Sequence, residues 1–322
     1  MFQMSFRKVL AVALVLGATQ IGAFAQGHPK GNPEQGDDDP SVLVSGGTHA
    51  MMKSGEDIHS SANASLINQA NIHNLTYYGG PVLKNEKIVK VLYGTTGFQS
   101  FLTSTATTGA TVAGFLTGVV GSPYYAWLSE YSTTSPAQTI GLGSFSASKT
   151  ITPAAARNGA TITDLQIQAE ISAQITSGGL PAPDANTVYS LFFPSGKKIT
   201  QGGSTSCVQF CAYHGTFVRN GQNVYYTVLP DLSASGCSTG CGTSTLFNNT
   251  TSVLSHELIE TVTDPAVGIA TVYAAPLAWY NKTYGEIGDI CNGQQGTVAG
   301  TNGTTYTVQK EWSNKSAICK VQ

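Results

Sequence analysis

The amino-acid sequence predicts a single mixed α/β domain, stabilised by disulfides, in which a polar-faced helix packs against a mixed sheet. Three observations predict this fold class. Short apolar segments rich in β-branched residues alternate with stretches of helical length, a pattern typical of α/β proteins. One segment around residue 256 has helical periodicity, and all six cysteines lie at or beyond Cys207. Of the 322 residues, 41% are hydrophobic, which suffices for a sizeable core.

Charged side chains are scarce in this sequence. They make up 11% of the residues, against about 25% in typical soluble proteins. The 16 Lys and Arg residues nearly balance the 18 Asp and Glu residues, which gives a net charge of −2. A basic surface for nucleic acid or for acidic lipid is therefore not expected. High hydrophobicity with low net charge also excludes disorder for most of the chain.

The N-terminus has the pattern of a secretory signal peptide over residues 1–25. Arg7 and Lys8 form a positive region, the apolar run 9–16 follows, and Ala-Phe-Ala at 23–25 is a small-x-small cleavage site. A membrane anchor is the alternative, but this run is shorter than the roughly 20 residues that span a bilayer. We therefore expect a secreted, extracellular protein without a membrane span.

Residues 26–75 are predicted to be a flexible leader, and residues 76–322 to be the folded domain. The first part of the leader is rich in Gly, Pro, Asp and His and poor in apolar residues. Such a composition does not form a packed core. From about Tyr77 the chain changes to apolar segments that Gly and Pro interrupt.

Four segments are predicted to be strands of the sheet. Lys87–Tyr93 is apolar and β-branched and stops at Gly94, as a buried strand does. Val188–Phe193 and Val224–Leu229 have the same character. Thr304–Trp312 is expected to close the sheet near the C-terminus.

Helices are predicted before and between these strands. Residues 97–131 contain apolar stretches of helical length, interrupted by the Gly-Ser-Pro of residues 121–123. Asp164 could cap a helix that reaches Thr176 and stops at Gly178. The same residues also alternate as a strand does, so both structures stay open there.

The six cysteines predict three disulfides, because an exported protein folds in an oxidising compartment. The repeated C-x3-C spacing makes Cys207–Cys211 and Cys237–Cys241 natural local bridges, which leaves Cys291–Cys319 as the third pair. Sequence alone permits many other connectivities. A four-cysteine zinc site built from the two C-x3-C pairs is the alternative, since zinc sites allow this spacing.

The residues that point to chemistry begin on the predicted helix Ser252–Thr263. Its apolar residues share one face, and His256 and Glu260 lie one turn apart on the other. The run His-Glu-Leu-Ile-Glu resembles the H-E-x-x-H helix of zinc hydrolases, with Glu260 in place of the second His. This pattern predicts His256 and Glu260 as zinc ligands and Glu257 as the general base for a bound water. A zincin-like domain is the corresponding fold.

Further metal ligands are expected from Glu286, Asp289 and His214. In this charge-poor chain, five of the last seven acidic residues fall between Glu257 and Asp289. His214 and the helix histidine are the only two histidines beyond residue 73. Three simpler explanations stay open: a solvated helix face, carboxylates that cap helix ends, and a structural calcium site.

Six blocks of sequence occur in order across nearly the whole predicted domain. They are the Y-x-G-G-P-V-L of Tyr77–Leu83, the cysteine-aromatic-histidine element Cys207–His214, the second cysteine pair Cys237–Cys241, the S-V-L-S-H-E-L-I-E of Ser252–Glu260, the E-I-G-D-I-C of Glu286–Cys291, and the Q-x-x-W…C of Gln309, Trp312 and Cys319. In this order they resemble the EXORDIUM or phosphate-induced protein 1 family of secreted proteins. The stretch 97–177 matches the family pattern weakly.

The resemblance implies that Glu260 belongs to the family pattern, and it makes His214 a site residue. Plant members of the family are associated with the apoplast, the cell wall and growth regulation. The family has no settled biochemical activity that could be carried over.

Two functions from different classes follow from these observations. The first is a secreted zincin-like metalloprotein that hydrolyses peptide or cell-wall substrates with zinc, calcium being the alternative ion. The second is a non-catalytic extracellular protein that binds cell-wall polysaccharide or takes part in signalling. In the second, exposed aromatic side chains would stack on sugars, and the candidates are Tyr124, Tyr125, Trp127, Trp279 and Tyr280.

Overall fold

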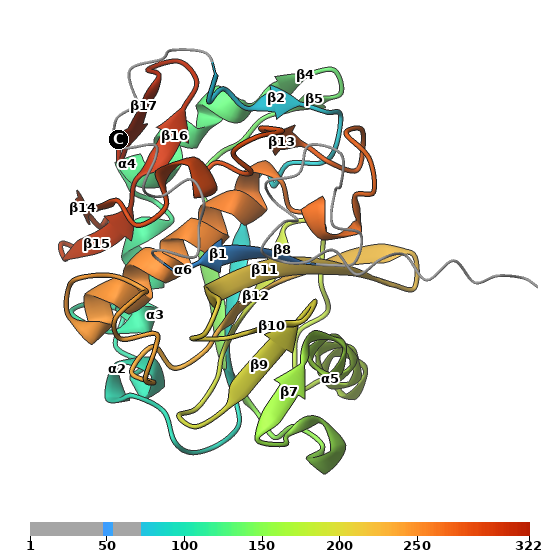
Figure 1. The fold of residues 1–322 in the computed structure, drawn as a ribbon, viewed down its shortest axis with the longest axis vertical. Coiled ribbons are helices and arrows are strands. Elements are labelled where there is room, and N and C mark those ends of the chain that lie inside the picture. The colour runs from blue at the N-terminus through green and yellow to red at the C-terminus, as the bar shows by residue number, and fades with distance from the viewer. Residues whose placement is uncertain (1–47, 54–71) are drawn as a thin grey trace, which may run out of the picture.

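The computed structural model describes residues 48–53 and 72–322. The predicted signal peptide and most of the predicted leader lie outside these residues. The centre of the described part of the chain is a six-stranded sheet with the strand order β1-β11-β12-β8-β3-β6 (Figure 1). Its strands are β1 (Thr48–Met52), β3 (Lys87–Tyr93), β6 (Ser144–Ile151), β8 (Thr187–Phe192), β11 (Phe210–Arg219) and β12 (Gln222–Leu229).

The sheet is mixed, as predicted. β6, β3, β8 and β12 are parallel, whereas β11 is antiparallel to β12 and β1 is antiparallel to β11. Parallel strands are covered on both faces and are therefore continuous apolar runs. β8 is buried throughout, and β3 is buried apart from Lys87 at its start. The predicted strands at 87–93, 188–193 and 224–229 are confirmed.

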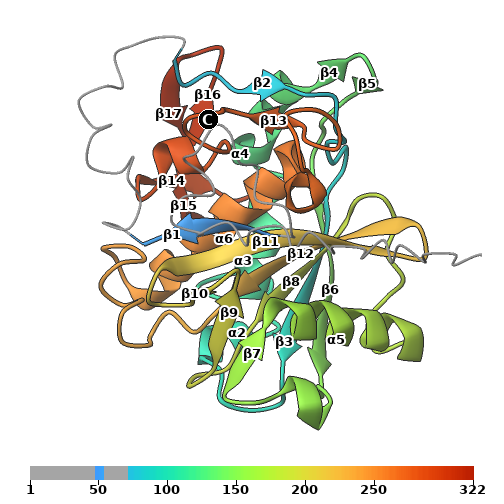
Figure 2. The same ribbon diagram turned by 45° about the vertical axis from the view of Figure 1, so that its right-hand side comes forward.

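Helices cover both faces of the sheet (Figure 2). The main covering elements are α3 (Val112–Val119) and α6 (Leu246–Thr263) on one face, and α5 (Asp164–Ser177) with the small sheet β7 (Thr161–Thr163), β9 (Lys198–Gln201) and β10 (Ser204–Thr205) on the other. Alternate residues of β3 enter two cores. Ile88 and Leu92 pack on the side of α6 and α3, whereas Val89 and Val91 pack on the side of α5. This alternation follows from the two-residue period of a strand.

The helix that carries the H-E-x-x-E pattern, α6, is longer than predicted. It begins at Leu246 because Thr245 caps it: the Thr245 hydroxyl accepts a hydrogen bond from the backbone N–H of Asn248. It ends at Thr263, as predicted, directly before Asp264 and a proline.

The ambiguous segment after Asp164 is a helix. Thr163 and Gln166 form a capping box at its start, which satisfies two backbone N–H groups. Gly178 ends it in the left-handed region, at a φ of 79°. The apolar residues Ile167 and Ile171 then lie one turn apart and enter the core under the sheet.

Short elements complete the described chain. Residues 97–131 contain helices on both sides of the predicted break, which falls at 121–122, and a second, unpredicted interruption lies at 104–111. The remaining elements are β2 (Thr76–Tyr77), α2 (Ser100–Thr103), α4 (Pro123–Ala126), η2 (Trp127–Tyr131), β4 (Thr133–Thr134), β5 (Ala137–Gln138), η3 (Ala155–Arg157), η4 (Val267–Ile269), β13 (Trp279–Tyr280), η5 (Asp289–Cys291), β14 (Gln295–Ala299), β15 (Thr305–Gln309), β16 (Glu311–Ser313) and β17 (Ile318–Lys320).

The prediction that Thr304–Trp312 closes the main sheet is wrong. This segment forms β15 and β16, which pair with β14 and β17 in two separate two-stranded sheets. β15 lies against α6, where the Thr251 hydroxyl donates to the carbonyl of Thr307 and the backbone N–H of Gln309 donates to the Ser255 hydroxyl. An apolar alternation indicates a half-buried strand but does not specify its partner.

Three disulfides cross-link the chain, and two of the predicted pairings are wrong. The bridges are Cys207–Cys237, Cys211–Cys241 and Cys291–Cys319, of which only the last was predicted. The two C-x3-C segments lie side by side, so each cysteine meets one from the other segment, at Cα distances of 4.4 and 5.6 Å. Because all six cysteines are oxidised, the alternative four-cysteine zinc site is also wrong.

Part of the predicted flexible leader belongs to the sheet. Residues 48–52 form the edge strand β1, which pairs with β11. Met51 and Met52 are buried there, and this apolar pair explains why the segment adds to the sheet. Within the described residues, no helix combines the length and apolar character that crossing a bilayer requires.

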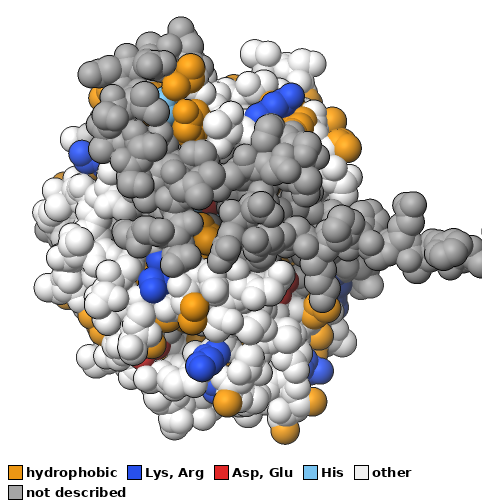
Figure 3. All heavy atoms as spheres, viewed as in Figure 1, with side chains coloured by type: hydrophobic (Ala, Val, Ile, Leu, Met, Phe, Trp, Pro, Cys, Tyr) orange, Lys and Arg blue, Asp and Glu red, His pale blue; other side chains and the backbone are white. Residues whose placement is uncertain are grey.

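Charged side chains are sparse on the molecular surface. On the face in Figure 3, Lys and Arg are scattered and Asp and Glu are rarely visible among uncharged groups. This agrees with the composition of the chain.

Candidate metal centre

Three parts of the chain bring the predicted site residues together under the sheet-facing side of α6. β11 supplies His214, α6 supplies His256, Glu257 and Glu260, and the loop that leads into η5 supplies Glu286 and Asp289. The side chains that pair with the two imidazoles are wholly buried, except that of Asp289, which is 13% exposed. The solvated helix face considered above is therefore wrong for these residues.

The first cluster contains His214, Glu260 and Glu286, whose ligand atoms lie within 4.8 Å of one another. Nε2 of His214 is 3.5 Å from Oε2 of Glu286. On the other side of the ring, Nδ1 is 3.3 Å from Oε2 of Glu257 and 3.4 Å from Oε2 of Glu260. When Nδ1 donates its proton to Glu257, the lone pair of Nε2 faces Glu286. A carboxylate that holds a histidine in this tautomer is the common support of a metal ligand.

The second cluster contains His256, Glu260 and Asp289, also within 4.8 Å. Nε2 of His256 is 3.1 Å from Oε2 of Glu260, as the i,i+4 spacing predicted, and 3.8 Å from Oδ1 of Asp289. The structure thus divides the five predicted ligands between two clusters that share Glu260. The two histidines belong to different clusters.

Asp264, one of the five acidic residues between Glu257 and Asp289, belongs to neither cluster. Asp264 follows the last turn of α6 and accepts a hydrogen bond from the backbone N–H of Ala278 through Oδ1, at 2.9 Å. This contact connects the end of α6 to the loop that follows it. This structural contact is sufficient to explain the carboxylate at position 264 without a metal.

The donor set fits a divalent cation. Among the described residues, Oε1 of Glu260 and Oε1 of Glu257 have no hydrogen-bond donor, and Oε2 of Glu260 faces the two imidazoles. Burying a carboxylate without compensation costs several kcal/mol, on the order of 2–7 kcal/mol even for a neutral polar group. No Lys or Arg of the described chain forms an ion pair with the two clusters. A cation between these lone pairs would supply the missing partner.

The electrostatics of the clusters also favour positive charge. Burial by itself lowers the pKa of an imidazole, but the surrounding carboxylates outweigh it. They raise the pKa of His256 to about 10 and that of His214 well above its usual value. Burial raises the pKa of Glu260, yet the two imidazoles more than reverse this and lower it. Protons on the imidazoles therefore take the place of a metal, and a metal would compete with them.

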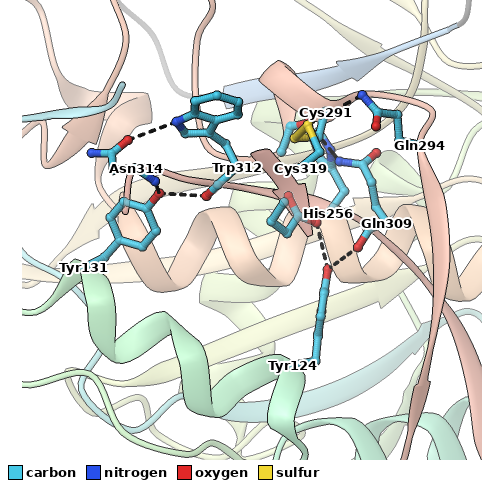
Figure 4. Close-up of a disulfide and its surroundings, with 11 residues drawn as sticks. Tyr124, Tyr131, His256, Cys291, Gln294, Gln309, Trp312, Asn314 and Cys319 are labelled. Atoms are coloured by element: carbon cyan, nitrogen blue, oxygen red, sulfur yellow. Dashed lines mark hydrogen bonds between the residues drawn. A yellow bond between two sulfur atoms is a disulfide. The ribbon is translucent and has the colours of Figure 1, made fainter. Parts of the chain in front are cut away.

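Two supporting residues were given no role by sequence reasoning. Nε2 of Gln309 is 2.8 Å from Nδ1 of His256 and donates to the carbonyl of Gly288, also at 2.8 Å (Figure 4). A Cβ at Gly288 would lie 2.6 Å from Nδ1 of His256 and 2.8 Å from Oε1 of Glu260. The sequence signals were the glycine in Glu-Ile-Gly-Asp and the glutamine of the closing block. Their meaning depends on tertiary contacts.

The aromatic residues proposed for sugar stacking are mostly internal. Tyr124, Tyr125 and Tyr280 are buried, which rules out a stacking platform for these three. The hydroxyl of Tyr124 donates to Glu311, and that of Tyr125 donates to Glu86. The two tryptophans, Trp127 and Trp279, are partly buried and pack against the core.

Glu86 is a buried carboxylate next to α6, and it should make stability depend on pH. Burial raises its pKa from 4.5 to about 7, against the opposing hydrogen bonds from Tyr125 and Thr261. Between these two values the unfolded chain releases the proton and the folded chain keeps it, so stability falls as pH rises. The size is about 3 kcal/mol, from about 1.4 kcal/mol per pKa unit.

We expect Glu86→Gln to remove this dependence. The amide still accepts from Tyr125, and it donates to the Thr261 hydroxyl, which itself donates to the carbonyl of Leu258. Denaturant unfolding at pH 4.5 and pH 7.5 measures the difference between variant and wild type. From pH 4.5 to pH 7.5, the free energy of unfolding of the variant should rise by about 3 kcal/mol relative to that of the wild type. If the difference between the two proteins is the same at both pH values, Glu86 is ionised in the folded protein at both.

Comparison of the chain with family models, curated proteins and solved structures finds no match. The likeness to the EXORDIUM or phosphate-induced protein 1 family therefore rests on the sequence blocks alone. The function has to be argued from the geometry of the centre.

Proposed function

We propose that this protein is a secreted, EXORDIUM-like metalloprotein with a zincin-like centre, and that it hydrolyses peptide or cell-wall substrates. His214, Glu260 and Glu286 hold a divalent cation, and Glu257 supports His214. The single observation that carries the proposal is the position of Glu260. Oε2 of its buried carboxylate lies 3.1 and 3.4 Å from the two imidazoles, and its Oε1 has no hydrogen-bond donor among the described residues.

Zinc is the ion that this donor set suits best. Imidazole nitrogen is a usual ligand of zinc and other transition metals, whereas calcium takes oxygen ligands almost alone. Both clusters contain one imidazole and two carboxylates. The imidazoles therefore favour zinc over calcium, and the carboxylates reduce the preference for zinc over manganese.

The three disulfides support the secreted location. Disulfides persist in oxidising compartments and are rare in the cytosol. All six cysteines are paired here. The predicted cleavage site after residue 25 gives the corresponding route out of the cell.

A bound zinc supplies Lewis acidity and lowers the pKa of its water to about 7. The chain's own residues would position that water and its substrate. Glu257 accepts the Nδ1 proton of His214 and so keeps Nε2 directed at Glu286. Asp289 is the one cluster residue whose side chain is partly exposed, so solvent and substrate would enter from its side.

Glu257 is assigned a positioning role in this proposal, whereas the sequence predicted a general base. The variant Glu257→Gln separates the two. If the residue positions His214, the variant lowers zinc affinity about 10- to 100-fold, because second-layer carboxylates contribute that much. Turnover per bound zinc would change little. If it is the base, the variant keeps its zinc and loses turnover by at least about 100-fold.

Zinc affinity is measured by competition with a chelating dye, and turnover with a fluorogenic peptide library and dye-linked cell-wall polysaccharides. Glu257→Asp is the matched variant that keeps the charge. The hydrolase proposal fails if the zinc-loaded wild type cleaves none of these substrates. It also fails if zinc removal leaves an observed cleavage unchanged.

A non-catalytic extracellular role is the second candidate, and the burial of the centre favours it. Catalytic zinc keeps one open coordination position, whereas structural zinc is closed. Here every cluster side chain but Asp289 is wholly buried. Stoichiometric zinc, a large loss of melting temperature on chelation and no cleavage of any substrate would identify this role.

A further inference from the structure

We infer that the centre holds two divalent cations bridged by Glu260, one at His214 and Glu286 and the other at His256 and Asp289. This inference rests on the proposed function and deepens it. A mononuclear centre on an H-E-x-x-E helix would bring both histidines to one ion. The structure instead places each histidine with the shared Glu260 and one further carboxylate, Glu286 for His214 and Asp289 for His256.

The geometry of the bridge is the first argument. A carboxylate oxygen of Glu260 lies within 4.8 Å of ligand atoms of His214 and Glu286, and also within 4.8 Å of ligand atoms of His256 and Asp289. Glu260 is the only member of both clusters found among the described residues. Dinuclear hydrolytic centres hold their ions about 3.5–4 Å apart. A shared carboxylate with two oxygens spans such a distance.

The charge of the site is the second argument. Glu257, Glu260, Glu286 and Asp289 give −4 when ionised, and the two imidazoles are neutral when they ligate metal. One divalent cation leaves −2 in a buried site, whereas two bring the sum to zero. Among the described residues, the positive partners of these carboxylates are the two imidazoles when they are protonated. Two divalent cations would replace that positive charge once the imidazoles ligate metal.

The buried atoms of the second cluster are the third argument. Nε2 of His256 is wholly buried and faces oxygens of Glu260 and Asp289, at 3.1 and 3.8 Å. Oε1 of Glu260 is equally buried and has no hydrogen-bond donor among the described residues. These are the atoms that a second cation would bind.

The histidines of the two positions differ in how well their hydrogen bonds prepare them to ligate metal, so we expect one position to bind its cation more tightly than the other. At His214, Oε2 of Glu257 already lies 3.3 Å from Nδ1, in position to accept a hydrogen bond from it. At His256, the amide nitrogen of Gln309 faces Nδ1 and also donates to the carbonyl of Gly288. Ligation of a cation through Nε2 of His256 requires a proton on Nδ1. The Gln309 side chain must then turn its amide oxygen toward that proton, which breaks the hydrogen bond between its amide nitrogen and the carbonyl of Gly288. The second cation should therefore bind at least about tenfold more weakly, the cost of one buried hydrogen bond.

The test is a titration of the full secreted protein, freed of metal with a chelator, with Zn²⁺ and separately with Mn²⁺. We expect two equivalents of each, the second bound at least tenfold more weakly. Electron paramagnetic resonance of the manganese form should show isolated Mn²⁺ at one equivalent and an exchange-coupled pair at two. Asp289→Asn should lose the weaker equivalent only. Asp184→Asn, a surface carboxylate paired with Lys87, is the matched control and should keep both.

The outcomes separate this inference from the proposed function. Binding of a single equivalent, or two equivalents without exchange coupling, overturns the two-cation centre and leaves a mononuclear metalloprotein. Two equivalents retained in Asp289→Asn at wild-type affinity also overturn it. Binding of no metal overturns the proposed function itself.

Discussion

Replacing Glu260 by glutamine should abolish metal binding at the centre. Glu260 is the residue that both clusters share, and an amide offers neither the charge nor two equivalent oxygens. We expect zinc affinity to fall by at least about 100-fold, which is about 2.7 kcal/mol. Zinc at 100 times its dissociation constant stabilises the wild type by about 2.7 kcal/mol, or roughly 5–10 °C in melting temperature. In Glu260→Gln this zinc-dependent gain should disappear.

The melting temperatures of the metal-free proteins give an independent test of the role of Glu260. The two imidazoles lower the pKa of Glu260, so its charge is compensated in the metal-free protein and Glu260→Gln breaks a buried pair. Metal-free Glu260→Gln should therefore melt lower than the metal-free wild type. Glu170→Gln is the matched control. Glu170 is equally buried and accepts from Arg157 on the opposite face of the sheet, so this variant loses an ion pair and keeps its zinc. A zinc-dependent gain that persists in Glu260→Gln would contradict the assignment.

Replacing Gly288 by alanine should damage the centre without touching a ligand. The added Cβ would lie 2.6 Å from Nδ1 of His256 and 2.8 Å from Oε1 of Glu260. The backbone there has a φ of −80°, which any residue adopts, so the effect is steric alone. We expect a loss of about 1–3 kcal/mol in the free energy of unfolding, the usual cost of overpacking. Metal affinity should fall at the same time, because both contacted side chains are ligands.

Gly121→Ala is the control for this change. A Cβ there would meet the side chain of Thr301 at 3.2 Å, far from the two clusters, and its backbone φ also lies outside the left-handed region. Chemical denaturation with and without zinc measures both variants. If Gly288→Ala matches Gly121→Ala in stability and in zinc affinity, the centre is not packed as tightly as the structure indicates.

Local sequence patterns predicted much of the fold. The continuous apolar, β-branched character of Lys87–Tyr93 identified a central strand of the sheet, because such a strand is buried on both faces. Helical periodicity with a following proline located the end of α6 at Thr263. These signals are local, so tertiary structure did not need to be known.

Relations between segments were the part that local patterns could not provide. The C-x3-C spacing suggested bridges within each segment, but the bridges Cys207–Cys237 and Cys211–Cys241 join the two segments. Spacing along the chain measures proximity in sequence only. The same limit explains why the last strands were assigned to the wrong sheet, since a half-buried strand fits any sheet edge.

For the site, the sequence identified the residues but not their grouping. His214, Glu257 and Glu286 come from separate parts of the chain and meet in the interior, as their concentration in a charge-poor sequence had suggested. The division into two clusters around Glu260 depends on how α6 lies over β11. No pattern within one segment contains that information.

X-ray absorption at the zinc K-edge, measured on the protein as secreted, is the most direct test of the central claim. The account predicts bound zinc whose first shell contains only nitrogen and oxygen at about 2.0–2.2 Å, with one imidazole per zinc. It predicts no sulfur scattering at about 2.3 Å, because the cysteines are in disulfides. A sulfur shell, or a protein that carries no metal and takes up none, would contradict a centre built on His214, Glu260 and Glu286.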